Sequence, residues 1–217
     1  MFRKILLSAV LIAVSTAANA GPVIFSEGFD SISAMNSAGW LAGNFSTPGG
    51  ESSWFQGNTG IFDAQAGAAD SYIAANYLSA GFGGNVDNWL VTPLISSASG
   101  GTVTFSTRTA GNLFGDNLEV LFSNTGSLDT ADYVSLGTIG SASYPTDWTT
   151  FNFLYDTTAA NVRFAFRYTV TDTSINGDYI GIDSLSVAVP EPGTMMLLGA
   201  GLLLMPLTMR RRRREQS

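Results

Sequence analysis

The sequence contains no cysteine and no histidine among its 217 residues. Without cysteine there are no disulfides, so a domain of this length must be held together by its hydrophobic core. Without histidine, Ser-His-Asp and Cys-His catalytic sets are excluded, and zinc sites lose their commonest ligand. These absences remove several enzyme classes before any motif is considered.

Basic residues are scarce in the body of the chain. Seven of the ten lie in the terminal segments, whereas fifteen of the seventeen acids lie between Gly21 and Val189. This central region has three arginines against fifteen acids, which gives a formal net charge of −12. Such a surface repels nucleic acid and anionic lipid and attracts metal cations. We therefore expect no nucleic-acid partner.

The N-terminal segment has the three parts of a secretory signal peptide. Arg3 and Lys4 form a positive start, residues 5–14 are apolar apart from one serine, and residues 18–20 read Ala-Asn-Ala. Small residues in this spacing precede a signal peptidase cleavage site. The apolar run is too short for a bilayer core of about 30 Å. The sequence thus predicts a signal peptide over residues 1–20, cleaved after Ala20.

The C-terminal segment, residues 189–217, combines a proline motif, an apolar run at Thr194–Met209 and a block of five arginines. Each arginine costs roughly 2.5–3.5 kcal/mol at the centre of a membrane, so the block stays in the cytoplasm. We expect a transmembrane helix that leaves everything before it outside the inner membrane. The residues of this signal are Pro190, Glu191, Pro192, Arg210, Arg211, Arg212, Arg213 and Arg214.

The region between the two ends shows no helical periodicity. Short apolar runs alternate with turns rich in Gly, Asn, Asp and Ser, which is typical of a β-sandwich or barrel. In the clearest strand, Asn161–Val170, the even positions face one way and the odd positions the other. Residues 28–67 are expected to be packed loop. The other expected strands are 23–25, 71–77, 89–95, 102–109, 118–122, 149–155 and 178–187.

The last expected strand changes phase. Its apolar positions 180 and 182 share one parity, and positions 185 and 187 share the other. Because side chains alternate strictly along a strand, we expect a bulge near Asp183-Ser184. Asn176-Gly177, just before this strand, is either a tight hairpin turn or part of a longer loop.

The C-terminal segment resembles the PEP-CTERM sorting signal, in which a Pro-Glu-Pro motif, an apolar helix and an arginine block follow one another. The resemblance implies processing near the Pro-Glu-Pro by a membrane protease-transpeptidase called exosortase. It also implies a Gram-negative bacterium that makes extracellular polysaccharide. The protein would be anchored in the inner membrane first and would then reach the cell surface or the extracellular matrix.

Four segments of the body resemble the choice-of-anchor J domain, which is similar to cleaved-adhesin and MAM-type jelly rolls. This resemblance implies an all-β jelly-roll sandwich over residues 21–188. Related domains often have Asp-Asp where this chain has Asp183-Ser184. The matching segments are 25–30 (FSEGFD), 72–77 (YIAANY), 87–93 (DNWLVTP) and 182–185 (IDSL).

Glu27, Asp30 and Asp183 are the candidate metal ligands. The first two flank the opening strand and the third lies at the expected bulge. In the jelly rolls that the chain resembles, the first and last strands lie side by side, so these carboxylates would meet. Ca²⁺ accepts six to eight oxygen ligands and suits such a site in a structural role. The alternative is that the three acids are solvated or cap turns.

Five aromatic residues are candidates for a surface that stacks on sugar rings. The alternative is that they fill the core, as tryptophans in β-sandwiches usually do, and this favours a core position for the one at 89. None is assigned to a ligand. The five residues are Trp40, Trp54, Tyr77, Trp89 and Trp148.

The sequence predicts a non-catalytic protein of the cell surface or matrix, acting in adhesion or in binding of extracellular polysaccharide. One alternative is a carbohydrate-active enzyme that uses paired carboxylates, since glycoside hydrolysis needs no histidine. The fifteen acids of the body do not single out a pair, so no catalytic residue is assigned. A third hypothesis is a structural unit of a surface layer that binds no glycan.

Overall fold

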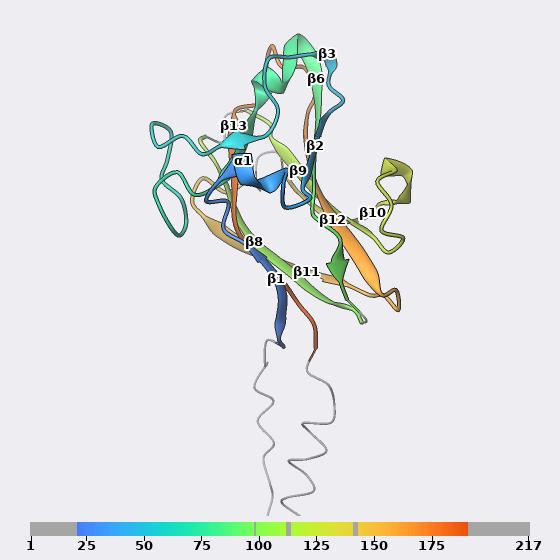
Figure 1. The fold of residues 1–217 in the computed structure, drawn as a ribbon. Coiled ribbons are helices and arrows are strands. Elements are labelled where there is room, and N and C mark those ends of the chain that lie inside the picture. The colour runs from blue at the N-terminus through green and yellow to red at the C-terminus, as the bar shows by residue number, and fades with distance from the viewer. Residues whose placement is uncertain (1–20, 98, 112–113, 141–142, 191–217) are drawn as a thin grey trace, which may run out of the picture.

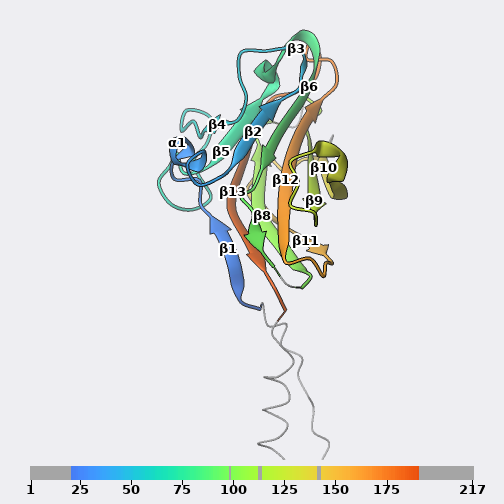
Figure 2. The ribbon, with the colours of Figure 1, turned by 45° about the vertical axis from the view of Figure 1, so that its right-hand side comes forward.

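The computed structural model describes residues 21–97, 99–111, 114–140 and 143–190. Within these ranges the chain forms two antiparallel β-sheets that pack face to face (Figures 1 and 2). The all-β sandwich predicted from the sequence is confirmed. No helix in these ranges is long and apolar enough to cross a membrane. The expected signal peptide and the expected membrane segment, at 1–20 and 194–209, lie outside the described residues.

The first sheet has the strand order β11-β8-β13-β5-β4, with β1 beside β13. The second has the order β10-β9-β12-β6-β2, with β3 beside β6 and β7 beside β12. The first sheet consists of β1 (Val23–Glu27), β4 (Phe55–Gln56), β5 (Ile73–Asn76), β8 (Gly101–Thr109), β11 (Thr149–Tyr155) and β13 (Tyr179–Ala188). The second consists of β2 (Leu41–Asn44), β3 (Thr47–Gly49), β6 (Ala80–Val91), β7 (Ile95–Ser96), β9 (Asn117–Ser123), β10 (Val134–Gly140) and β12 (Asn161–Val170). The short helices are α1 (Ile32–Met35), η1 (Tyr77–Ser79) and η2 (Thr130–Asp132).

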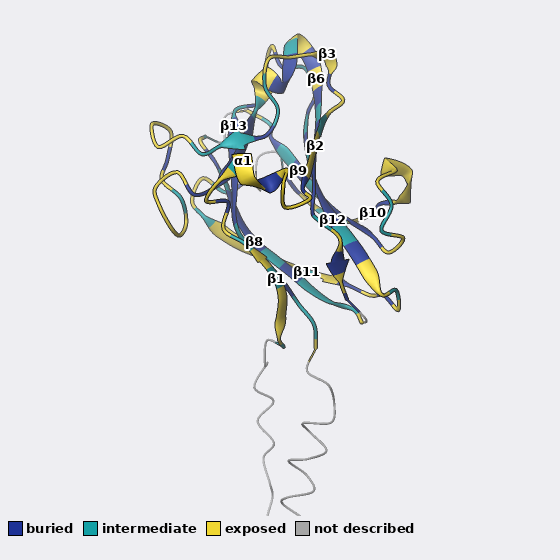
Figure 3. Cartoon of the chain, viewed as in Figure 1, coloured by how far each residue is buried: buried dark blue, intermediate teal, exposed yellow. Residues whose placement is uncertain are grey.

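The core lies between the sheets, and β12 shows why the sequence folds this way. Its even positions from 162 to 170 are all buried, as the alternation predicted. β12 pairs with β6 on one side and β9 on the other, so these side chains enter the centre of the sandwich. There Phe166 meets Phe105 of the first sheet edge to face, with ring centres 5.0 Å apart. Figure 3 shows burial concentrated on inner strands such as β8 and β13, with exposure along the loops and on strands such as β1.

One strand prediction and one loop prediction were wrong in part. The expected strand at 89–95 is the end of β6, which begins nine residues earlier and stops at Val91, before Pro93. Proline has no backbone N–H for the ladder, so pairing resumes only in β7. Residues 28–67, expected as loop, contain α1, β2, β3 and β4. These strands have two to four residues each, too few for a visible alternation.

β13 changes its neighbour halfway along. Residues 179–182 pair with β5 and residues 185–188 pair with β1, while β8 pairs along the other edge. At the change the register shifts between Asp183 and Ser186, and Ser184 has a φ of 53°. The predicted bulge is confirmed, as is the side-by-side placement of the first and last strands. The stretch 171–178, which includes Gly177, is a longer loop rather than a tight hairpin.

The two ends of the described domain lie together. The N–H of Val189 donates a hydrogen bond to the carbonyl oxygen of Pro22 at 3.2 Å. Figures 1 and 2 show both ends at the bottom of the sandwich, with β3 and the start of β6 at the opposite end. The segment that carries the sorting signal therefore leaves the domain beside its first strand.

Candidate ligand-binding groove

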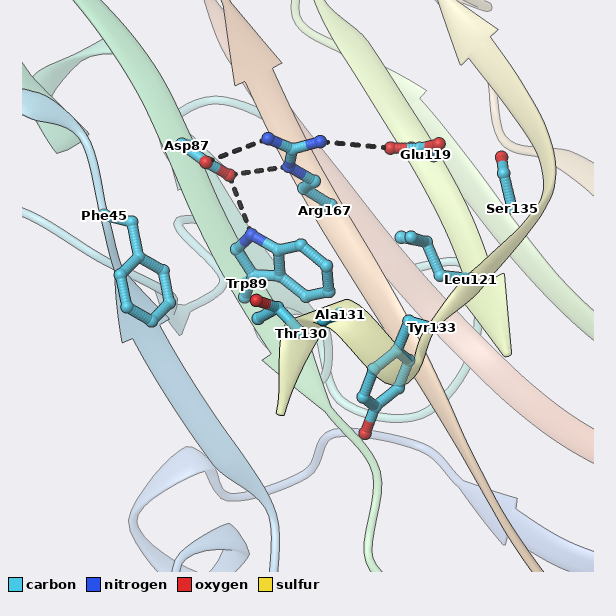
Figure 4. A pocket seen from close by; sticks show the side chains of 10 residues that line it. All are labelled: Phe45, Asp87, Trp89, Glu119, Leu121, Thr130, Ala131, Tyr133, Ser135 and Arg167. Carbon is cyan, nitrogen blue, oxygen red and sulfur yellow. Dashed lines mark hydrogen bonds and ion pairs between the residues drawn. The ribbon is translucent and has the colours of Figure 1, made fainter. Parts of the chain in front are cut away.

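A groove with a volume of ≈ 630 Å³ lies on the outer face of the second sheet. This volume is within the range of small-molecule and saccharide sites, about 300–1,000 Å³. β6, β9 and β12 form its floor, and loops on either side form its walls (Figure 4). The lining residues are Phe45, Asp87, Trp89, Glu119, Leu121, Thr130, Ala131, Tyr133, Ser135 and Arg167.

Arg167 is the central polar residue of the floor. In the sheet it lies directly between Trp89 of β6 and Glu119 of β9. Its guanidinium donates to Asp87 through Nε at 2.7 Å and Nη2 at 2.9 Å, and to Glu119 Oε2 through Nη1 at 3.4 Å. All three side chains point outward because odd positions of these strands face away from the core. The result is a row of one cation and two carboxylates across the sheet, drawn in Figure 4.

Trp89 forms part of the floor beside this row. Its indole N–H donates to Asp87 Oδ1 at 2.8 Å, and the guanidinium carbon of Arg167 lies 5.3 Å from the ring centre. The ring of Tyr133 packs edge-on against it at 5.9 Å. With 6% of its surface exposed, Trp89 is a rigid base for the groove and not a free stacking platform.

Phe45 forms one wall and is 60% exposed, which makes it the accessible aromatic ring of the groove. Its backbone N–H donates to the carbonyl of Asp87 at 2.8 Å, so the wall is tied to the floor. The ring lies over Gly43, where an added Cβ would be 2.9 Å from a ring carbon. Glycine at this position therefore allows the ring to lie close to the sheet.

The opposite wall is the loop between β9 and β10, which contains η2. The Tyr133 hydroxyl donates to the carbonyl of Ser127 at 3.1 Å, which holds the loop in a compact form. Arg163 fastens it to the sheet: Nε donates to the carbonyl of Gly126 at 3.1 Å, and Nη1 to that of Thr92 at 2.7 Å. The backbone of both walls is thus held in place before any ligand arrives, which lowers the entropy cost of binding.

The electrostatics of the floor keep Asp87 ionised. Burial acts to raise the pKa of Asp87, but the hydrogen bonds and charge of Arg167, with the Trp89 N–H, outweigh it and lower the pKa. The hydrogen bond from Arg167 to Asp87 in turn raises the pKa of the arginine. A glycosidase acid needs a raised pKa so that it carries a proton at neutral pH. Asp87 has the opposite shift, so it is not suited to the role of that acid, whereas an ionised carboxylate is a good acceptor for hydroxyl groups.

The predicted calcium ligands lie near the change of partner in β13. The buried Asp183 carboxylate accepts the N–H groups of Gln65 at 2.8 Å, Ala66 at 3.0 Å and Ser184 at 2.5 Å. Burial raises the pKa of Asp183, although these N–H groups oppose the shift. Oδ2 accepts the first two of these hydrogen bonds and Oδ1 accepts the third.

Glu27 is the last residue of β1, and Asp30 follows three residues later. Glu27 pairs with Leu185 in the ladder and accepts the Phe29 N–H at 2.8 Å. A Cβ on Gly67, next to Ala66, would be 3.3 Å from Asp30 Oδ1. Acids from both chain ends therefore border one loop. Within the described ranges, however, no three acidic side chains come close enough to form a carboxylate metal site.

The five candidate aromatic residues do not form one surface. Trp40 and Trp54 are buried, and Trp89 is buried in the groove floor, as the core interpretation expects. Trp148 is half-buried over the first sheet, where its indole N–H donates to the carbonyl of Asp63. Tyr77 is partly exposed in η1.

Sequence reasoning missed Phe45, Tyr133 and Arg167 as groove residues. Two signals could have identified Arg167. The alternation in Asn161–Val170 places it on the outer face of the sheet, and the body of the chain has two other arginines. Its partner Asp87 is 80 residues away, so their meeting depends on the order of strands in the sheet.

Residues 188–214 match the PEP-CTERM protein-sorting motif. This confirms the sorting signal identified in the sequence and implies that the protein is exported. Of the signal residues, Pro190 lies within the described ranges, whereas Glu191, Pro192 and the five arginines lie outside them. No curated protein matches the chain.

Three cleaved adhesin domains are among the solved structures that share the fold. The K1 cleaved adhesin domain of Lys-gingipain from Porphyromonas gingivalis W83 is 22% identical, with a TM-score of 0.56 over 80% of this chain and 100% of that one. The K3 domain from the same strain is 20% identical, with a TM-score of 0.55 over 77% and 98%. The K2 domain is 16% identical, with a TM-score of 0.56 over 76% and 99%. At these identities the likeness is one of fold, the jelly-roll sandwich.

Proposed function

We propose that the protein is an exported, non-catalytic protein of the cell surface or extracellular matrix, and that it binds polysaccharide in the groove on the second sheet. The observation that carries the proposal is the groove itself, with an exposed aromatic ring, Phe45, beside the fixed row of Asp87, Arg167 and Glu119. An aromatic wall next to fixed polar groups suits a sugar, which has apolar ring faces and hydroxyl edges.

The sorting motif supports the proposed place of action. In this proposal signal peptidase removes residues 1–20, the C-terminal helix holds the chain in the inner membrane, and exosortase processes it near Pro190-Glu191-Pro192. The body then reaches a surface or matrix that contains polysaccharide. The resemblance of the fold to domains named cleaved adhesins is consistent with a role in attachment.

The lowered pKa of Asp87 favours binding over the alternative of a glycoside hydrolase. A hydrolase needs one protonated and one ionised carboxyl flanking the bond. Here both groove carboxylates contact the same guanidinium. In this proposal the groove holds a sugar chain, and Asp87 does not supply the acid that would cleave it.

Affinity electrophoresis of the full chain in detergent, through gels that contain different polysaccharides, tests the function. We expect retardation by at least one polymer, no release of reducing sugar, and loss of most retardation in Phe45→Ala. Leu154→Ala is the control, because Leu154 is 79% exposed on β11 of the other sheet. Release of reducing sugar, or equal retardation of both variants, would contradict the proposal.

We further propose that Glu27, Asp30 and Asp183 hold a structural Ca²⁺ after a local rearrangement, since within the described ranges no three acidic side chains are close enough to share an ion as they stand. What supports it is a buried carboxylate, Asp183, that pairs with no arginine among the described residues. Backbone carbonyl oxygens would have to complete the six to eight ligands that Ca²⁺ takes. The ion would join the first and last strands and has no part in glycan binding.

A further inference from the structure

We propose that the groove selects by charge: it takes neutral, hydroxyl-rich polysaccharide and rejects polymers that carry carboxylate or sulfate groups. This inference rests on the proposed glycan-binding function and specifies its ligand class. It follows from the charges on the groove floor and from where the few arginines of the body lie.

The floor has two negative charges and one positive charge. Asp87 and Glu119 both contact Arg167, which uses Nε, Nη1 and Nη2 to hold them. An anionic sugar would have to approach this guanidinium past two carboxylates that already neutralise it. The carboxylates of Asp87 and Glu119 repel a negative group on the ligand, whereas they do not repel a neutral hydroxyl.

No second cation is placed to compensate. Within the described ranges the body has two other basic side chains, and both are engaged elsewhere. Arg108 belongs to β8 of the first sheet, where its guanidinium carbon lies 4.4 Å from the ring centre of Phe62. Arg163 holds the wall loop through the carbonyls of Gly126 and Thr92. The field of a domain with a formal charge of −12 adds to the repulsion.

The groove is instead rich in groups that accept hydrogen bonds. Arg167 contacts one oxygen of Glu119, at 3.4 Å, and leaves the other available. Thr130 and Ser135, which are both exposed, also line the groove with hydroxyl groups. Sugar hydroxyls are donors as well as acceptors, and hydrogen bonds to a carboxylate are stronger than those between neutral groups. The ligand that complements this groove is therefore a neutral polysaccharide rich in hydroxyl groups.

The test compares polymers that share a backbone and differ in charge: hydroxyethyl cellulose against carboxymethyl cellulose, and dextran against carboxymethyl dextran. The full chain is used in detergent without added divalent ions and without a chelator, so that few divalent ions bridge carboxylates and the proposed structural Ca²⁺ stays bound. At about 10 mM salt, where the Debye length is about 30 Å, we expect the carboxymethyl form to bind roughly tenfold more weakly. At about 150 mM salt the gap should narrow, while binding of the neutral form stays constant.

Glu119→Gln locates the effect in the groove. It removes one charge and keeps the shape, so the ratio of the two dissociation constants should fall roughly fivefold at low salt. Asp147→Asn is the matched control: Asp147 is an exposed acid before β11 of the first sheet, and its loss should leave the ratio unchanged.

The outcomes separate the two proposals. Stronger binding of the carboxymethyl forms, or an equal fall in the ratio for both variants, overturns charge selection and leaves glycan binding standing. No binding to any polymer, neutral or charged, overturns the proposed function and this inference together. A neutral preference that Glu119→Gln weakens and Asp147→Asn does not supports both.

Discussion

Arg167 donates two parallel hydrogen bonds to Asp87, from Nε to Oδ1 at 2.7 Å and from Nη2 to Oδ2 at 2.9 Å. The two residues are 80 positions apart and lie on neighbouring strands, β12 and β6. Lysine has the same charge but does not form this fork. The pair therefore fixes both the position and the direction of the polar groups on the groove floor.

We expect Arg167→Lys to lower the free energy of unfolding by about 1 kcal/mol, because the pair is bidentate but about a third exposed to solvent. Urea unfolding of both single variants and of the double variant with Asp87→Asn measures the coupling. A coupling energy near zero would show that the fork does not stabilise the fold.

Gly43→Ala is expected to weaken polysaccharide binding several-fold without unfolding the protein. The new Cβ would be 2.9 Å from the Phe45 ring, which is free to move outward because the ring is exposed. Gly49→Ala, also in a short strand beside β6, places its Cβ 4.0 Å from the nearest atom and is the control. Equal affinities of the two variants would mean that the position of the Phe45 ring over Gly43 does not affect polysaccharide binding.

Phe105→Ala should cost about 3–5 kcal/mol of unfolding free energy, the usual range for removing a buried phenylalanine. Phe105 is fully buried and contacts Phe153 of the neighbouring strand β11 and Phe166 across the core. Phe82→Ala, at a side chain that is 89% exposed, should change stability by less than about 0.5 kcal/mol. Thermal or urea unfolding distinguishes them, and similar losses for both would contradict the described core.

The buried Asp116 makes stability depend on pH. Burial raises its pKa although Tyr168, Asp178 and Thr109 all donate hydrogen bonds to it. A raised folded-state pKa means that the carboxyl adds stability below its unfolded value of about 3.9 and loses it as the pH rises through the folded value.

Asp116→Asn, which does not ionise, should therefore gain stability relative to the native protein as the pH rises from about 4 to 7. Urea unfolding at a series of pH values gives this difference and cancels the effects of the other acids. A difference that changes in the opposite direction would indicate a lowered pKa for Asp116.

For the calcium proposal, we expect a chelator to lower the melting temperature of the native protein and to have less effect on Glu27→Gln. Glutamine retains an oxygen for the Phe29 N–H, so the local hydrogen bond survives the change. A saturating ion stabilises the folded state by mass action. An unchanged melting temperature, with no metal found by elemental analysis, would contradict the proposed Ca²⁺ site.

The sequence predicted the parts of the fold that depend on local alternation. β12 shows a strict period of two over ten residues, and the phase change in β13 indicated the bulge at Asp183-Ser184. β10 was missed for two reasons. Gly137 interrupts it and Gly140 ends it, and Ile139 is the single buried residue among its seven, so no alternation is visible. Local pattern is weak where a strand buries little.

The groove depends on pairings that local pattern does not contain. Trp89 was correctly interpreted as a buried residue, yet its role as a floor comes from Arg167 and Tyr133, which belong to other strands and loops. Phe45 lies in a segment expected to be loop, and its contact with Gly43 requires the turn between β2 and β3. Strand order supplies this information, and a single sequence does not.

The position of β13 determines how the body would resist a pull on its C-terminal end. Tension there reaches β13, which is flanked by β8 on one side and by β5 and β1 on the other. Drawing this strand along its own axis would shear both rows of interstrand hydrogen bonds at once, whereas an edge strand can be peeled away one bond at a time. Under a pull on its C-terminal end, the sandwich domain would therefore stay folded until the hydrogen bonds on both sides of β13 break together.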